Sequence, residues 1–152
     1  MYTLKNVSVN QRMSEETTCF VADLYRNGAK VLAVQNRGYG GGHNYYDYVK
    51  GALDDADAYA KTRPATIYQG VTIAPDLDSM IDDLLNEHLL EKDAKKYLKK
   101  FCFKDGDYLY TMNVAPDCAK TAAYVAATYP NAVVMRDAAS IIAHLRAGQW
   151  GA

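Results

Sequence analysis

Residues 17–36 read TTCFVADLYRNGAKVLAVQN, and this stretch decides the fold of the first part of the chain. Between Thr17 and Tyr25 the apolar residues Phe20, Ala22 and Leu24 occupy every second position, which is the period of a β-strand. Asn27-Gly28 follows, and this dipeptide between two strand-like runs is the strongest short signal for a hairpin. We therefore predict that Lys30–Asn36 pairs antiparallel with Thr17–Tyr25.

The segments on either side extend this hairpin into an N-terminal subregion. A strand from Tyr2 to about Val9 is expected to join the sheet, and the polar segment Asn10–Glu16 is expected to form a loop. Farther on, apolar residues recur at three- and four-residue steps, which predicts a helix from about Asn44 to Lys61. Asn44 is its expected N-cap.

The longest predicted helix opens at Pro75-Asp76 and carries an apolar stripe as far as Phe101. Its first half is acidic and its second half is basic, so both ends complement the helix macrodipole. The lysine run in the second half could bind phosphates. We interpret it instead as a solvated helix end whose positive charges complement the helix dipole.

The C-terminal part begins with Asp105-Gly106, a second hairpin signal. A strand (Tyr108–Asn113), a helix (Pro116–Thr128) and an apolar strand (Ala132–Met135) follow, an order typical of a βαβ crossover between parallel strands. Asp137 is expected to cap a last helix.

These elements predict an α+β fold, in which an N-terminal antiparallel sheet with packed helices is followed by a C-terminal hairpin and a βαβ-like unit. We expect one domain over residues 1–152, with a β-rich subregion at about 1–63 and an α/β subregion at about 75–148. The polar turn between them is the one candidate seam.

Composition narrows the functional classes. The 17 basic and 18 acidic side chains give a formal charge of −1, which argues against a broad electrostatic grip on nucleic acid. Three cysteines without a CxxC pair indicate a reduced, cytoplasmic protein. No apolar stretch is long enough for a membrane span. His43, His88 and His144 show no ligand spacing, so we expect no metal and no cofactor.

The segment 38–44, GYGGGHN, holds four of the ten glycines and stands between the predicted hairpin and the predicted helix. Exposed backbone N–H groups at a helix N-terminus can hold an anion, and neighbouring tyrosine rings suit a planar ligand such as a nucleotide. The loop matches neither the Walker A nor the Rossmann pattern. The alternative is a tight turn that needs glycine for its backbone angles. The expected ligand-binding residues are Gly38, Tyr39, Gly40, Gly41, Gly42, His43 and Tyr45.

Two other groups of side chains suggest chemistry. Cys19, His43 and Glu16 could act as nucleophile, base and orienting group, although cysteine on a half-buried strand is usually an inert small hydrophobe. The carboxylates at 54–57 and 82–83 look solvated. Alternatively, such a row on a helix could imitate a nucleic-acid backbone and block the basic cleft of a nuclease.

Five short segments follow one another in this order along the chain: EETTCF at 15–20, YRNG at 25–28, NRGYGG at 36–41, YTMN at 110–113 and YPNAVV at 129–134. In these segments the chain resembles a group of small uncharacterised proteins of phages and bacterial mobile elements. The resemblance implies a setting, the host-cell cytoplasm for a phage-encoded chain, in which accessory proteins counter host defence, either by occupying an effector or by sequestering a nucleotide signal.

The first functional hypothesis is therefore a non-catalytic protein that binds an anionic planar ligand, either a nucleotide or a nucleic-acid phosphate, at Gly38–Gly42. The second is an inhibitor that binds a host defence nuclease, such as a CRISPR effector, through its tyrosine-rich or acidic surfaces. The third is a hydrolase or transferase that uses Cys19 and His43.

Overall fold

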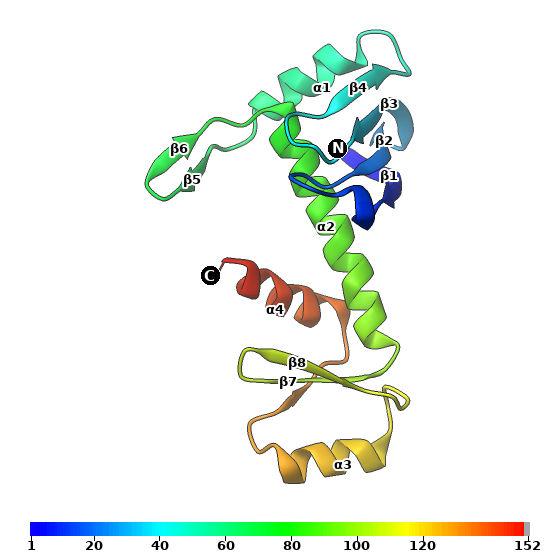
Figure 1. The fold of residues 1–152 in the computed structure, drawn as a ribbon, viewed down its shortest axis with the longest axis vertical. Helices are drawn as coiled ribbons and strands as arrows, with labels where there is room; N and C mark the ends of the chain where they lie inside the picture. Colours follow the sequence, from blue (N-terminus) through cyan, green and yellow to red (C-terminus); the bar gives the residue numbers. More distant parts are fainter. Residues whose placement is uncertain (151–152) are drawn as a thin grey trace. The chain divides into compact units, whose positions relative to one another are not determined.

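A computed structural model describes residues 1–150, and the side chains of residues 1–148 (Figure 1). Its sheets are antiparallel and have helices packed on them, so the predicted α+β class is confirmed. The chain divides into two compact units, Met1–Asn86 and a second that begins at Glu87. This division falls inside helix α2 (Leu77–Leu98), later in the chain than the seam expected from composition.

The first unit is built on a four-stranded antiparallel sheet. Its strands are β1 (Tyr2–Val9), β2 (Phe20–Arg26), β3 (Ala29–Asn36) and β4 (Asn44–Asp47), and they lie side by side in this order. The predicted hairpin is confirmed, with Leu24 opposite Leu32. The buried face of β2 and β3 carries Phe20, Ala22, Leu24, Leu32 and Val34.

The helix predicted from Asn44 to Lys61 was wrong in nearly the first half of its length. Asn44–Asp47 is strand β4, which continues the sheet by pairing with β3, and helix α1 spans only Ala52–Lys61. The N-cap position is Gly51 and not Asn44, and the Asp47 carboxylate accepts the backbone N–H groups of Gly51 (3.2 Å) and Leu53 (2.9 Å) at the start of the helix. The glycine-rich loop therefore joins two antiparallel strands, and no helix begins at its end.

Helices α1 and α2 bury one stripe each, as their patterns predict. In α1 the stripe is Ala52, Ala56 and Ala60, and this helix contacts β3 and β4. Asp76 opens α2, because its carboxylate accepts the N–H of Ser79 (2.8 Å) while the Ser79 hydroxyl accepts the N–H of Asp76 (3.0 Å).

Two short elements of the first unit are more regular than the sequence predicted, since the expectation was a loop at Asn10–Glu16 and a loop or short strand at Ala65–Ile73. A 3₁₀ helix spans Gln11–Met13 in the loop between β1 and β2. Strands β5 (Thr66–Tyr68) and β6 (Val71–Ile73) form a hairpin that reaches out from the ends of α1 and α2 (Figure 1). Its two turn residues, Gln69 and Gly70, both have positive φ, as a two-residue hairpin turn requires.

The second unit contains a three-stranded sheet in the order β8-β7-β9, with β7 (Phe101–Asp105), β8 (Tyr108–Met112) and β9 (Val133–Val134). Both β8 and β9 run antiparallel to β7, so they are parallel to each other. Helix α3 (Ala119–Thr128) connects them. The predicted crossover between parallel strands is therefore present, but β7 lies between the two strands that it joins.

Helices cover both faces of β7. Phe101 and Phe103 pack on Val125 of α3, whereas Cys102 points to the other face and packs with Ala94 of α2. Helix α4 (Ala138–Trp150) adds Ile141 to that second face. The Asp137 carboxylate accepts the backbone N–H of Ser140 at 2.8 Å, which confirms Asp137 as the cap of this helix.

Candidate functional site

The glycine-rich loop is tied to the rest of its unit by Gly38. The carbonyl oxygen of Gly38 accepts the backbone N–H groups of Glu15 (3.1 Å), Glu16 (3.0 Å) and Thr17 (3.4 Å). Gly38 has φ +86°, and a β-carbon there would lie 2.1 Å from the carbonyl oxygen of Met13. Three amides do converge on one point in this region, but that point is the protein's own carbonyl oxygen.

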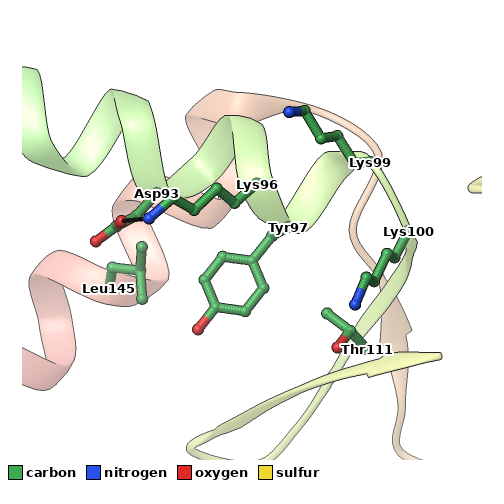
Figure 2. A pocket seen from close by; sticks show the side chains of 7 residues that line it. All are labelled: Asp93, Lys96, Tyr97, Lys99, Lys100, Thr111 and Leu145. Atoms are coloured by element: carbon green, nitrogen blue, oxygen red, sulfur yellow. Dashed lines mark ion pairs between the residues drawn. The ribbon is translucent and has the colours of Figure 1, made fainter. Parts of the chain in front are cut away.

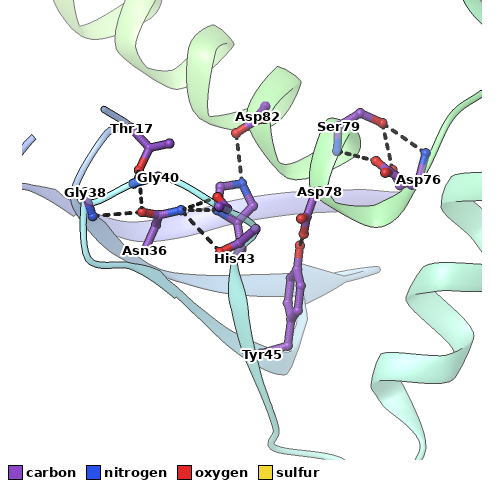
Figure 3. A network of polar contacts seen from close by, with 12 residues as sticks. Thr17, Asn36, Gly38, Gly40, His43, Tyr45, Asp76, Asp78, Ser79 and Asp82 are labelled. Atoms are coloured by element: carbon purple, nitrogen blue, oxygen red, sulfur yellow. Dashed lines mark hydrogen bonds and ion pairs between the residues drawn. The ribbon is translucent and has the colours of Figure 1, made fainter. Parts of the chain in front are cut away.

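The amides of the loop itself are also engaged (Figure 3). The N–H of Gly38 donates to Asn36 Oδ1 at 2.8 Å, and the N–H of Gly40 donates to Thr17 Oγ1 at 3.2 Å. The Thr17 hydroxyl in turn donates to Asn36 Oδ1 at 2.7 Å. Two of the N–H groups that an anion would need are therefore already used inside the protein.

Asn36 fixes the state of His43. A backbone N–H can only donate, so the oxygen of the buried Asn36 amide must face Gly38 and its nitrogen must face His43 Nδ1, which lies 3.1 Å away. Nδ1 then accepts a hydrogen bond, and the proton of the neutral ring lies on Nε2, 2.8 Å from Asp82 Oδ1. Both ring nitrogens of His43 are thus occupied.

Tyr45 makes the second link between β4 and α2. Its hydroxyl donates to Asp78 Oδ1 at 2.5 Å (Figure 3). Burial first, and then the hydrogen bond to this carboxylate, raises the pKa of Tyr45 above its ordinary value, because ionisation would place a second negative charge beside Asp78. The hydroxyl is therefore a fixed donor rather than a free contact for a ligand.

Carboxylates lie against the loop. Glu16 Oε2 would be 2.6 Å from a β-carbon on Gly40, and Asp78 Oδ2 would be 2.5 Å from one on Gly42. Together with Asp82 on His43, they place three acidic groups where the sequence suggested a phosphate. Like charges at such distances repel. Of the predicted ligand residues only Tyr39 offers a largely open ring, with 60% of the residue exposed.

Cys19 lies close to the loop but not in an activating arrangement. It is half-buried and lines a small cavity of about 190 Å³ together with Asn36 and Arg37. Because Asn36 and Asp82 take both nitrogens of His43, no ring nitrogen is left to accept the thiol proton.

A different pocket lies in the second unit, beside the lysine run that the sequence analysis interpreted as a solvated helix end (Figure 2). It lies at the C-terminal end of α2 and has a volume of about 490 Å³. Three lysines, a tyrosine and a threonine surround it, with one acidic and one apolar side chain. The lining residues are Asp93, Lys96, Tyr97, Lys99, Lys100, Thr111 and Leu145.

The charges of this pocket are only partly compensated. Lys96 Nζ lies 3.6 Å from Asp93 Oδ1, and both side chains are exposed. Within residues 1–150, neither Lys99 nor Lys100 has a carboxylate at ion-pair distance. The C-terminal end of a helix carries a partial negative charge, so the lysines at this end of α2 lie where the macrodipole favours cations.

The floor of the pocket is apolar. The ring of Tyr97 and the side chain of Leu145 both pack against the buried cluster of Ala94, Cys102 and Ile141. In Figure 2 the Tyr97 ring stands between Leu145 and the pair formed by Lys100 and Thr111, and Lys96 turns toward Asp93. A planar ligand could therefore lie near a fixed aromatic ring while the lysines hold its negative charge.

A sequence signal for this pocket exists, but it is incomplete. Asp93, Lys96, Tyr97 and Lys100 follow the i, i+3, i+4, i+7 spacing of one helix side. Thr111 and Leu145 come from other elements, and only the fold brings them to the lysines.

The described residues contain neither a candidate metal site nor a membrane-spanning helix. Among residues 1–150, no three His, Cys, Asp or Glu side chains are grouped so that they could hold a metal ion. No helix in this part of the chain combines the length and the apolar character that crossing a membrane requires. Comparison with models of protein families, with characterised proteins and with solved structures finds no match to this chain.

Proposed function

We propose that this protein binds a planar, phosphate-bearing ligand of the nucleotide class in the pocket at the end of α2. The observation that carries the proposal is the grouping of Lys96, Lys99 and Lys100 around the ring of Tyr97. The volume of about 490 Å³ lies within the range of roughly 300–1,000 Å³ that small-molecule sites occupy.

Each part of such a ligand has a matching partner. Lysine ammonium groups are strong donors to phosphate, and among the described residues no carboxylate lies at ion-pair distance from Lys99 or Lys100. The Thr111 hydroxyl adds a neutral donor or acceptor beside them. Tyr97 is partly buried against the core, so its ring can support a base with little loss of side-chain freedom.

The glycine-rich loop supports this function less well than the lysine pocket does. The amides of Gly38 and Gly40 donate to side chains of the protein, and the carboxylates of Glu16 and Asp78 stand against the same loop. The proposal therefore keeps the class of ligand inferred from the sequence and assigns it to a different set of residues.

The resemblance to phage and mobile-element proteins suggests which nucleotides to try first. Accessory proteins in that setting sequester the nucleotide signals of host defence, so cyclic dinucleotides and cyclic oligonucleotides belong in the screen beside AMP, ADP, ATP and inorganic phosphate. Binding without turnover is the expected behaviour.

Thermal unfolding of the full chain tests the proposal. A nucleotide present at a hundred times its dissociation constant is expected to stabilise the folded state by about 2.7 kcal/mol. Inorganic phosphate alone should give a smaller shift, because it leaves the ring of Tyr97 uncovered. Raising the salt concentration should weaken binding, since the contacts are ionic.

A charge-matched pair of double variants locates the site. Lys99→Gln with Lys100→Gln should weaken nucleotide binding at least about tenfold, because each lost ionic hydrogen bond contributes roughly 1.5 kcal/mol or more. Lys92→Gln with Lys95→Gln removes the same charge from the last turns of α2, at residues that do not line the pocket, and should change binding less than about threefold. Equal losses in the two variants, or no stabilisation by any of these nucleotides, would contradict the proposal.

A second candidate is inhibition of a nuclease by the first unit. Here the observation is a cavity of about 390 Å³ whose lining includes the carboxylates of Asp54, Asp57, Asp76 and Asp78. Basic side chains of a nuclease would find complementary charge there. Cleavage of DNA by a purified CRISPR nuclease should then be inhibited by the wild-type chain and restored by Asp54→Asn with Asp57→Asn. Inhibition that these two changes leave intact would rule this surface out.

A further inference from the structure

The β5–β6 hairpin of the first unit presents an apolar face that the described chain does not cover. Its register places Thr66 opposite Ile73 and Tyr68 opposite Val71. Directly opposite residues share a face, as do residues two apart along a strand, so all four side chains lie on one side. We call this side, Thr66, Tyr68, Val71 and Ile73, the Tyr68 face.

The Tyr68 face is open to solvent. The exposed fractions are 55% for Tyr68, 64% for Val71 and 48% for Ile73. In the described residues, β5 and β6 pair with each other and with no other strand. A two-stranded hairpin is only marginally stable in water unless something packs on it. The hairpin is thus an element whose burial is incomplete within one chain.

The segment is also without charge. No Asp, Glu, Lys, Arg or His occurs from Pro64 to Pro75, which contains the whole hairpin. Natural proteins usually protect exposed strands with charged side chains, because unprotected ones pair with other chains. An uncharged face does not repel a copy of itself, and it offers nothing to a partner that selects by charge. The formal charge of −1 on the whole chain adds little repulsion between two copies.

We propose that the Tyr68 faces of two copies of this chain pack against each other about a twofold axis and form a homodimer. A twofold interface needs only one patch that complements itself. Tyr68 of one copy would then pack on Val71 and Ile73 of the other, and the same contact would occur twice. Because four side chains of each copy form a patch well below the size of a standard interface, we expect a weak, reversible dimer rather than a permanent one.

Sedimentation velocity of the full chain between 1 and 200 μM tests this. The wild-type chain should shift from monomer to dimer across the series. Val71→Lys should weaken the dimer at least about tenfold, because an ammonium group would be buried against an apolar surface. Thr66→Lys, which keeps every apolar side chain of the Tyr68 face, should act in the same direction.

The hairpin provides its own control. Ile67 is 74% exposed but lies on the opposite face together with Thr72, so Ile67→Lys adds the same charge to the same strand without touching the Tyr68 face. This variant should dimerise like the wild type, within about threefold. Thermal unfolding of all three variants verifies that each remains folded.

Two results would overturn the proposal. One is a wild-type chain that stays monomeric at 200 μM, in which case flotation with phosphatidylcholine vesicles would show whether the face instead meets a lipid surface. The other is a loss of dimer in Ile67→Lys equal to that in Val71→Lys, which would mean nonspecific association of an apolar hairpin.

Discussion

The two units of this chain use their polar side chains in opposite ways. In the first unit, His43 pairs with Asp82, Tyr45 with Asp78, and Asn36 with the backbone of the glycine-rich loop. In the described part of the second unit, the lysines that line the pocket have one ion pair, between Lys96 and Asp93 at 3.6 Å. Residues 1–86 carry 8 basic and 11 acidic side chains, for a formal charge of −3, and residues 87–152 carry 9 and 7, for +2.

This difference separates scaffold from candidate site. Hydrogen-bonding groups that already have protein partners stabilise a conformation, and a ligand could use them only by breaking those bonds. Charged groups around a cavity without protein partners are available to a ligand at no such cost. The more conspicuous motif, the glycine-rich loop, belongs to the first kind, and the plain lysine run belongs to the second.

The largest expected effect is a loss of stability of the first unit on substitution of Gly38. Gly38→Ala should lower the free energy of unfolding by about 3 kcal/mol or more, because it combines strain at positive φ with a clash against the Met13 carbonyl. Gly41→Ala is the control, since Gly41 also has positive φ but has open space around it, and it should cost only about 1 kcal/mol. Urea unfolding measures both. Equal costs would mean that the close approach to Met13 contributes nothing.

The next effect concerns the amide of Asn36. Asn36→Ala should cost about 2–3 kcal/mol, because it leaves the Gly38 N–H and the Thr17 hydroxyl without their acceptor. Asn44→Ala, at an exposed position on β4, should cost less than about 0.5 kcal/mol.

Nuclear magnetic resonance of the His43 ring checks the reason for that cost. Long-range ¹H–¹⁵N spectra of the wild type should show a neutral ring protonated at Nε2, with Nδ1 as the acceptor from Asn36. A wild-type ring protonated at Nδ1 would show that the Asn36 amide is turned the other way.

A smaller effect appears at alkaline pH through Tyr45. Its pKa is raised in the folded state, so its contribution to stability is fully present below the unfolded value of about 10 and is lost as the pH rises above that value. The slope from this one group is at most about 1.4 kcal/mol per pH unit. Tyr45→Phe should cost about 1 kcal/mol at pH 7 and should flatten the decline above pH 10.

Tyr46→Phe is the control for that measurement. Tyr46 is the next residue on β4 but is mostly exposed, and its hydroxyl only accepts a hydrogen bond from Gln35. Unfolding followed by circular dichroism between pH 8 and 11.5 compares the two variants. An alkaline decline that both variants retain in full would show that the Tyr45–Asp78 contact does not control it.

The parts of the fold that the sequence predicts are those that local patterns determine. The Asn27-Gly28 hairpin and the long helix α2 follow from a turn dipeptide and from a sustained apolar stripe. Asn44–Asp47 was assigned to the wrong class because its pairing with β3 is a tertiary choice, and the apolar spacing around Tyr45 and Val49 fits a helix equally well.

The sequence offered the lysine run as a possible phosphate site, but it did not show that these lysines border a pocket. His43 meets Asp82 across 39 residues of sequence, and no local pattern shows that such a contact will remove the histidine from use. In the same way, the sequence alone is compatible with a solvated helix end at Lys96, Lys99 and Lys100. Only the fold shows that Thr111 and Leu145 line a pocket together with them. The sequence signal for this pocket is a surplus of lysine beyond what a helix dipole requires.

The smallest expected effect concerns the lysine pocket of the second unit. Removing two of its lysines should leave the stability of the unliganded protein almost unchanged. Without ligand, Lys99→Gln with Lys100→Gln should alter the free energy of unfolding by less than about 0.5 kcal/mol, because no carboxylate of the described residues loses an ion pair and only a favourable interaction with the C-terminal end of α2 is lost. With a saturating nucleotide, the same variant should lose most of the added stability of the wild type. Urea unfolding with and without ADP separates the two quantities. A loss above about 1.5 kcal/mol in the absence of ligand would mean that these lysines hold the second unit together, and the lysine pocket would then be scaffold in the same sense as the glycine-rich loop.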